Sequence, residues 1–242
     1  MSESIAFRAI TIITVVRNAA EALETTIRSI APHLAPGIDY VIIDGASTDG
    51  TCEVIRRHHG LLKAWHSAPD RGVYDAMNRG WELANPESWV LYLGAGDRLL
   101  ALPQPEEFAG NPNTVIYGKV ELGNGVVFHP RVGYWLRLYN SLHHQALLIP
   151  RDLHRRPPFN LSFPLYADFD FNQRLLKQGA RFRFSANFHS YAAPGGLTQE
   201  LAIGELSAVT GKNFGPVWSG LARAGYLLSR HFPLLHKLRP IQ

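Results

Sequence analysis

The stretch ITIITVVRNAAEALETTIRSIAPHLAPGIDYVIIDGASTDGT, residues 10–51, decides the fold class. Residues 10–16 are a short β-branched run without a helical period, which predicts a buried strand. Between residues 23 and 34, four apolar side chains recur every three or four positions and predict one face of a helix. A Pro-Gly pair ends that helix, and residues 40–43 form a second apolar strand. Strand, helix and strand with short connections indicate an α/β fold with a parallel sheet.

The same alternation continues through the first hundred residues. After the second strand it predicts, in order, a short helix at 54–55, a strand at 61–65, a helix at 73–84 and a strand at 89–93. Ligands of such sheets bind beyond the carboxyl ends of the strands. Asn18, Asp44 and Asp97 follow three of these strands, so we expect a ligand crevice there.

The second half has a different pattern. A hairpin is expected from two strand-like runs around Gly123-Asn124-Gly125. The remaining expected elements are a strand at 146–149, a helix at 168–178 that ends before Gly179, and a strand at 181–184. No internal repeat or long linker separates two independent domains.

Composition narrows the class of protein. The chain has 242 residues, 46% hydrophobic and 18% charged, which excludes disordered and low-complexity classes. Its single cysteine, Cys52, excludes a disulfide framework and fits a reducing cytosol. The first residues lack a signal-peptide pattern, and no run approaches the roughly 18 apolar residues of a spanning helix. We therefore expect a soluble, cytoplasmic protein.

The positive charge is concentrated at the end of the chain. The net charge is +4, and residues 211–242 hold five cations and no Asp or Glu, so the rest is nearly neutral. This distribution does not fit a nucleic-acid binder, which is basic over a whole face. The segment also carries Trp, Leu and Phe. It is either an interfacial helix that touches an anionic membrane leaflet or a helix packed on the domain.

Four short motifs could carry chemistry, and each has a structural alternative. Asp44 opens the loop to Thr51 and could accept hydrogen bonds from a ribose or base, or the loop could merely cap the next helix. Asp75, Asn78 and Arg79 share one side of a helix opening, and Arg71 before that helix could meet an anionic ligand, or the residues could form an ordinary N-terminal charge pattern. Asp97 could hold Mg²⁺ or Mn²⁺ with a diphosphate, or serve as a turn residue.

The fourth motif is Asp168-Phe169-Asp170 at a helix start. A carboxylate there could act as a general base, or cap the helix. The pair His143-His144 with Gln145 lies beside an apolar strand, where structural histidines are common. The sequence lacks HExxH, P-loop, GxGxxG and GxSxG patterns, which argues against the common metalloprotease, NTPase, dehydrogenase and esterase sites.

Taken in order, these segments resemble the family 2 glycosyltransferases of the GT-A fold, particularly members that build bacterial surface polysaccharides. The motifs that carry the resemblance are IDGASTDGT, PDRGVYDAMNRG and GAGD, followed by HHQALLIPRDL, ADFDFNQRLLKQGARF and PGGLT. The resemblance covers residues 9–198. It implies a Rossmann-like, mostly parallel sheet flanked by helices, with a smaller mixed acceptor-side region.

The resemblance also implies an activity. It implies inverting transfer of a sugar from a nucleotide-diphosphate donor, usually UDP-linked, to a hydroxyl of a glycan or lipid-linked acceptor. The implied glycosyltransferase domain is 1–210, with a nucleotide-sugar half at about 1–100 and an acceptor half at about 101–210. Residues 211–242 are then a basic amphipathic tail that could attach the enzyme to the inner face of the plasma membrane.

By the same resemblance, each motif acquires a role. Asp168 is implied as the catalytic base, and Asp97 as the ligand of Mn²⁺ or Mg²⁺. The residues implied to bind the two substrates are Val16, Asn18, Asp44, Arg71, Asp75, Asn78, His144, Gln145 and Arg174. Where many relatives have Asp-x-Asp-Asp, this chain has Gly94-Ala95-Gly96-Asp97, which leaves the need for a metal open.

Two other functions stay open at this point. The missing carboxylates at Gly94 and Gly96 suit a non-catalytic nucleotide-sugar binder or partner subunit. A nucleotide-dependent oxidoreductase would use a similar sheet, but the chain lacks a GxGxxG motif.

Overall fold

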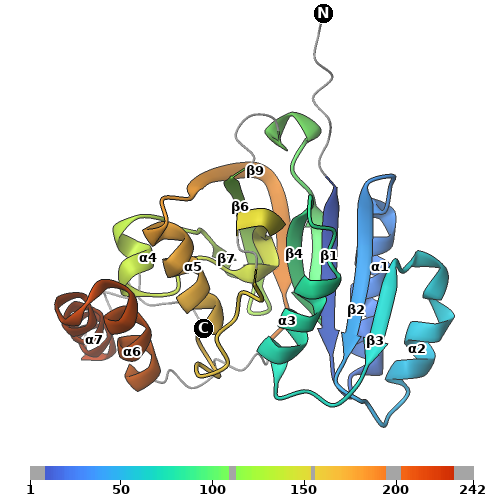
Figure 1. Cartoon of the computed structure of the whole chain (residues 1–242), viewed down its shortest axis with the longest axis horizontal. Coiled ribbons are helices and arrows are strands. Elements are labelled where there is room, and N and C mark those ends of the chain that lie inside the picture. Colours follow the sequence, from blue (N-terminus) through green and yellow to red (C-terminus); the bar gives the residue numbers. More distant parts are fainter. Residues whose placement is uncertain (1–8, 109–112, 154–155, 195–202, 232–242) are drawn as a thin grey trace, which may run out of the picture.

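The computed structural model describes residues 9–108, 113–153, 156–194 and 203–231, which form one mixed α/β body (Figure 1). In this described part, nine strands form a single sheet in the order β3-β2-β1-β4-β8-β6-β9-β5, with β7 paired to β6. The strands are β1 (Ile10–Val16), β2 (Ile38–Asp44), β3 (Ala64–Ser67), β4 (Trp89–Gly94), β5 (Arg98–Ala101), β6 (Thr114–Leu122), β7 (Val127–Phe128), β8 (Leu147–Pro150) and β9 (Arg181–Ala192).

Helices lie on both sides of this sheet. The α-helices are α1 (Ala20–Ile30), α2 (Thr51–Arg57), α3 (Val73–Leu83), α4 (Tyr134–Leu138), α5 (Ala167–Lys177), α6 (Ile203–Phe214) and α7 (Pro216–His231). Short 3₁₀ turns are η1 (Ala31–His33), η2 (His59–Leu61), η3 (Pro105–Phe108), η4 (His144–Ala146) and η5 (Arg151–Leu153).

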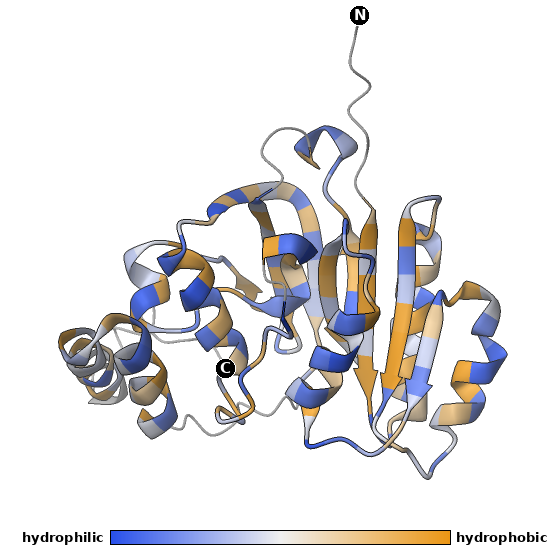
Figure 2. Cartoon of the chain, in the orientation of Figure 1, coloured by the Kyte–Doolittle hydropathy of each residue, from blue (hydrophilic) through white to orange (hydrophobic). Residues whose placement is uncertain are grey.

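The predicted parallel half is confirmed. Strands β3, β2, β1 and β4 are neighbours in that order, and every pairing among them is parallel. The third strand lies at 64–67 instead of 61–65, because residues 59–61 close a 3₁₀ turn first. Figure 2 shows the apolar residues concentrated in these central strands.

Two apolar cores lie on opposite faces of the sheet because successive strand side chains alternate. In β1, Ile13 and Val15 face a core that contains Trp81 of α3 and Phe169 of α5. Ile10, Ile12 and Val16 face the other core with α1 and α2. The seven residues of β1 are all buried, which explains why their sequence is continuously apolar or threonine.

The second half extends the same sheet with both parallel and antiparallel strands. Strand β8 pairs antiparallel to both β4 and β6, and β9 runs parallel to β6 and antiparallel to β5. The hairpin of β6 and β7 is confirmed. Three features differ from the sequence prediction: β9 continues to residue 192 instead of 184, and neither β5 nor α4 was expected.

The described C-terminal helices pack on the rest of the protein. The ring of Trp218 in α7 stacks on Tyr134 of α4, and Arg137 lies against the Trp218 ring at 4.9 Å from its centroid. The expected boundary at about residue 211 falls inside α6. Across the described part of the chain, no helix is long and apolar enough to cross a membrane.

Candidate active site

The carboxyl ends of β1, β2 and β3 bring three polar segments side by side. The register pairs Val16 with Asp44, and Asp44 with Ser67. Asp44 is fully buried, and its Oδ2 accepts hydrogen bonds from the Ser67 hydroxyl at 2.6 Å and the Ser47 N–H at 3.0 Å. Burial raises the pKa of this carboxyl, but the hydrogen bonds from Ser47 and Ser67 outweigh it and lower the pKa. Asp44 is therefore a fixed anion beneath the strand ends.

The two loops above Asp44 interlock. The N–H of Asn18 donates to the Ser47 hydroxyl at 2.7 Å, and Asn18 Oδ1 accepts the N–H of Thr48 at 2.8 Å. Asn18 and Ala46 both have positive φ, at 49° and 58°. Such a backbone is costly for alanine, and residues held in it cluster at binding sites. These loops are preorganised beside the predicted nucleotide position.

The start of α3 carries a charged cluster. Asp75 is buried and receives Arg71 Nη2 at 2.9 Å and Arg79 Nη2 at 3.0 Å. Burial raises the pKa of Asp75, but hydrogen bonds from Arg71 and the positive charges of Arg71 and Arg79 outweigh it and lower the pKa overall. A pocket of about 330 Å³ lies here, and its lining includes these three residues with Asn78. Glu82 also lines the pocket, so its two arginines and two carboxylates balance in charge. The Arg71 side chain is 77% exposed, which leaves its guanidinium accessible to a phosphate-bearing ligand.

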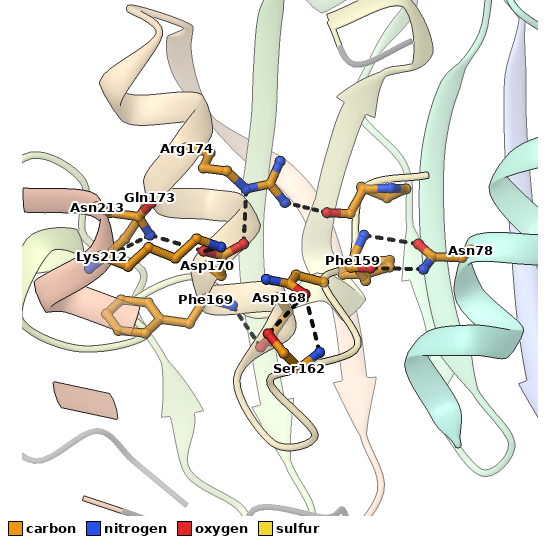
Figure 3. Close-up of polar contacts among 12 residues, drawn as sticks. Asn78, Phe159, Ser162, Asp168, Phe169, Asp170, Gln173, Arg174, Lys212 and Asn213 are labelled. Carbon is orange, nitrogen blue, oxygen red and sulfur yellow. Dashed lines mark hydrogen bonds and ion pairs between the residues drawn. The ribbon is translucent and has the colours of Figure 1, made fainter. Parts of the chain in front are cut away.

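The side chain of Asn78 hydrogen-bonds to the backbone of another segment of the chain. Its Nδ2 donates to the Phe159 carbonyl at 2.8 Å, and its Oδ1 accepts the Phe159 N–H at 2.9 Å (Figure 3). This double hydrogen bond ties α3 to the segment before α5. Asn78 lines the pocket next to Arg71, while its amide orders the backbone of Phe159.

Asp97 is turned toward the backbone. Its Oδ2 accepts the N–H of Gly94 at 2.8 Å, and its Oδ1 accepts the N–H of Ala193 at 2.9 Å. The side chain is 5% exposed, and burial raises the pKa of its carboxyl. Among the described residues, no group of three His, Cys, Asp or Glu side chains is placed to hold a metal. Within the described ranges, Asp97 is thus a single carboxylate, which is fewer oxygen ligands than a divalent ion needs from the protein alone.

Asp168 lies in the first turn of α5 with a different set of neighbours. The Tyr74 hydroxyl donates to its Oδ1 at 2.9 Å, and Asn140 Nδ2 donates to its Oδ2 at 2.9 Å. His144 Nδ1 is 3.8 Å from the same Oδ2. Burial raises the pKa of Asp168, but the nearby His144 and the hydrogen bonds from Tyr74 and Asn140 lower it overall. Asp168 is therefore a buried carboxylate that stays ionised at neutral pH.

The histidine pair lies on the strand side of Asp168. The ring of His143 packs edge-on against Phe128, with centroids 4.4 Å apart. Burial lowers the pKa of His143 to about 4, and the charge of His144 acts in the same direction. Gln145 is buried, and its Oε1 has no hydrogen-bond partner in the described part of the chain. His144 is the partly exposed member of this group and stands beside Asp168.

Arg174 belongs to a second cluster, away from the contacts of Asp168. Arg174 Nε donates to the fully buried Asp170 at 2.9 Å, and Lys212 Nζ lies 3.2 Å from the same carboxylate. Arg174 also donates to the Pro158 carbonyl (Figure 3). A pocket of about 290 Å³ lies beside this network, and Arg174 and Lys212 are among its lining residues. Asp168 and Asp170, two residues apart, thus have separate partners.

The structure groups the sequence-predicted residues into three sets. Val16, Asn18 and Asp44 meet at the strand ends, Arg71, Asp75 and Asn78 meet on α3, and His144 meets Asp168. Four contributing residues were missed: Ser47 and Tyr74 lie inside quoted motifs, Ser67 lies two residues before PDRGVYDAMNRG, and Asn140 lies in no motif. The motif PDRGVYDAMNRG contained the signal for Tyr74. Nothing in the sequence marks Asn140, because it reaches Asp168 only through the tertiary fold.

Sequence comparison gives one family match and several relatives. Residues 11–155 match the family described as glycosyl transferase family 2. A PGL/p-HBAD biosynthesis glycosyltransferase of Mycobacterium bovis (strain BCG / Pasteur 1173P2) is 33% identical over 178 residues, covering 67% of this chain and 68% of the relative. An uncharacterized glycosyltransferase of Mycobacterium tuberculosis (strain CDC 1551 / Oshkosh) is 30% identical over 102 residues, 42% of this chain and 35% of the relative.

Solved structures share the fold. S. aureus TarS 1-349 in complex with UDP-GlcNAc superposes with a TM-score of 0.64 at 14% identity, covering 93% of this chain and 73% of that one. A mannosyltransferase from Pyrobaculum calidifontis in complex with GDP-Man and Mn²⁺ gives a TM-score of 0.65 at 16% identity, covering 90% and 70%. At such identities the likeness concerns the fold, which is that of GT-A enzymes.

Proposed function

The chain belongs to glycosyl transferase family 2, and from this premise we propose that it is an inverting transferase acting on a UDP-linked sugar. The acceptor is a hydroxyl of a glycan or of a lipid-linked acceptor in surface polysaccharide or glycolipid synthesis. Two observations support the donor class: related folds bind UDP and UDP-GlcNAc, and the strand ends of this chain hold a fixed anion, Asp44, beside preorganised loops.

The observation that carries the proposal is the environment of Asp168. An Asp that stays ionised inside a buried, hydrogen-bonded setting can take a proton from an acceptor hydroxyl. That oxygen then forms a bond to the anomeric carbon while the bond from this carbon to the diphosphate oxygen breaks. The electron pair leaves with the diphosphate, and one displacement inverts the centre. Arg71 lines the nearby pocket with a largely exposed side chain, and it is the group proposed to meet the diphosphate.

A divalent ion would polarise the leaving diphosphate if one takes part. Asp97 is a single carboxylate with both oxygens engaged by backbone N–H groups, so no step above depends on an ion. Metal dependence stays a prediction of the family resemblance. It is measured by nucleotide release with Mn²⁺, Mg²⁺ or EDTA.

We also propose that the acceptor is met at an anionic membrane surface. Val217, Leu221 and Leu228 of α7 are each at least half exposed and repeat at four and seven residues, which aligns them along one face. Residues 211–242 carry five cations and no acid. An apolar stripe with only positive charge around it fits an anionic leaflet, which makes peripheral attachment the proposed mode.

The first test replaces the proposed base. Asp168→Asn keeps the size of the side chain but cannot accept a proton, so nucleotide release from UDP-sugars should fall by roughly 10²–10⁴-fold. Binding of UDP and UDP-GlcNAc, measured by calorimetry, should change little because Asp168 does not contact the strand-end cluster. Asp39→Asn, at the opposite end of β2, is the matched control and should keep full turnover.

Two outcomes would contradict the proposal. Turnover retained in Asp168→Asn would remove the base, and equal loss of UDP binding would give Asp168 a binding role instead. The competing hypothesis, a non-catalytic sugar-nucleotide binder, predicts donor binding without any nucleotide release from either protein.

A further inference from the structure

The carboxylate of Asp168 is nearly saturated with donors from separate elements. Its Oδ1 accepts the Tyr74 hydroxyl at 2.9 Å and the N–H of Phe169 at 2.8 Å. Its Oδ2 accepts Asn140 at 2.9 Å and faces His144 at 3.8 Å. A carboxylate has about four acceptor sites. Three are occupied by hydrogen bonds, so the fourth, on Oδ2 toward His144, is the one with room for a new partner.

Tyr74 connects this carboxylate to the donor side of the protein. It lies in the first turn of α3, next to Asp75 of the charged pocket. Its hydroxyl is 2.9 Å from Asp168 Oδ1 and 3.0 Å from the Leu165 carbonyl oxygen. A hydroxyl has one proton, so it can donate to one of these acceptors at a time. It favours Asp168 while that group is charged, because charge-assisted hydrogen bonds are stronger.

We propose that Tyr74 and Asn140 are positioning residues that fix the plane of the Asp168 carboxylate and leave Oδ2, on the His144 side, as its proton-accepting atom. The inference rests on the proposed function of Asp168. It adds an assignment for the Tyr of the PDRGVYDAMNRG motif, which binds neither the charged pocket nor the strand ends in the structure.

The proton balance agrees with this assignment. The acceptor hydroxyl gives its proton to Oδ2 as its oxygen bonds to the anomeric carbon, and the diphosphate leaves with the broken bond's electrons. Asp168 is then neutral and a weaker acceptor. The Tyr74 proton turns to the Leu165 carbonyl, so the buried hydroxyl keeps a partner throughout the cycle.

Other titratable groups face this site and must be followed as well. His144 and His143 approach from the η4 side, and Tyr166 stands at the start of α5. Glu205 of α6 acts on Tyr74 and Tyr166 through its charge. None of these is altered in the variants below, so each contributes equally to all of them.

The test compares two buried tyrosines. Tyr92 packs on Phe159 with centroids 5.3 Å apart, the same separation as Tyr74 and Phe159, but its hydroxyl donates to the Met77 carbonyl. Tyr74→Phe and Tyr92→Phe therefore delete the same group from the same aromatic cluster. The readout is the titration of Asp168 by carbon NMR of aspartate-labelled full-length protein, with its signal assigned by loss in Asp168→Asn.

Tyr74→Phe should raise the pKa of Asp168 by roughly one unit, since a charge-assisted donor is lost. Asn140→Ala should act in the same direction, and Tyr92→Phe should leave the titration unmoved. With UDP-GlcNAc, kcat of nucleotide release should fall roughly tenfold in Tyr74→Phe at unchanged KM. The acid limb of its pH profile should move to higher pH, because Asp168 must be ionised to act.

The possible outcomes separate this inference from the proposed function. If Tyr74→Phe and Tyr92→Phe titrate alike, the positioning role is overturned even where Asp168→Asn is inactive. If Tyr74→Phe shifts the titration while Asp168→Asn turns over normally, the contact is upheld and the base assignment falls.

Discussion

Burial keeps the imidazole of His143 uncharged at neutral pH. Its pKa is lowered to about 4 by burial, from 6.5 in the unfolded chain, so the unfolded state binds the proton more readily. The stabilisation from this group is present above pH 6.5 and is lost as the pH falls toward 4. Between pH 6.5 and 5 the free energy of unfolding should fall by about 2 kcal/mol from this residue.

Urea unfolding at pH 5.0, 6.5 and 7.5 measures this effect. His143→Gln removes the titrating group, so the variant should show a smaller loss of stability at pH 5 than the parent. His66→Gln, at an exposed position of β3, is the matched control for the substitution. Equal slopes in all three proteins would refute the assignment to His143.

The site residues show which chemistry can be predicted from local sequence. Asp44 could be located because it ends an apolar strand, and Asp168 because it lies in the first turn of a helix. The contacts of Asn78 and Arg174 could not be predicted, because their partners are backbone atoms of Phe159 and Pro158 in an irregular segment. The sequence specifies the residue types near a site better than it specifies what each one touches.

At the scale of elements, helices and strands with a local periodic pattern are easier to predict than strands that depend on partners far away in the sequence. The strands and helices of the first half have local periodicity, and their bounds agree with the structure to within a few residues. Strand β9 pairs with β6 and β5, from segments about 70 to 90 residues earlier, and its side chains alternate between buried and exposed only where both neighbours are present. That information lies outside any local window, so its second half was not predicted.

One glycine controls the pairing of β6 with β9. The register shifts between Tyr117 and Lys119, and a Cβ on Gly118 would lie 2.2 Å from the carbonyl oxygen of Phe188. Gly118→Ala must displace backbone, so the free energy of unfolding should fall by roughly 3 kcal/mol or more. Chemical unfolding measures the change.

Gly60→Ala is the control for this substitution. A Cβ on Gly60 meets no atom within 4 Å, so stability should stay within about 0.5 kcal/mol of the parent. Equal stability of Gly118→Ala and Gly60→Ala would show that the two strands can separate at this point without cost.

At the scale of the whole molecule, the exposed face of α7 should decide where the enzyme works. Leu221→Glu places a negative charge on the apolar stripe and should reduce flotation with anionic vesicles several-fold, because it weakens both apolar burial and charge attraction. Leu83→Glu is the control, since Leu83 on α3 is 47% exposed and Leu221 is 52% exposed. Vesicles of neutral lipid should bind both proteins weakly.

The dependence of vesicle binding on salt is a second test of the same surface. Binding to anionic vesicles should weaken as ionic strength rises, because surface charges are screened over shorter distances. Equal flotation of Leu221→Glu, Leu83→Glu and the parent protein would exclude α7 as the docking surface.

The position of β8 has a consequence for protein engineering. This four-residue strand stands between β4, from the first half of the chain, and β6, from the second half, and pairs with both. An exchange of second halves between relatives would therefore have to transplant β8 together with its edge on β4. Residues 9–100 produced alone would leave that edge unpaired and open to other chains. Within this fold, new acceptor specificities are best sought by changing loops and helices while the shared sheet is kept intact.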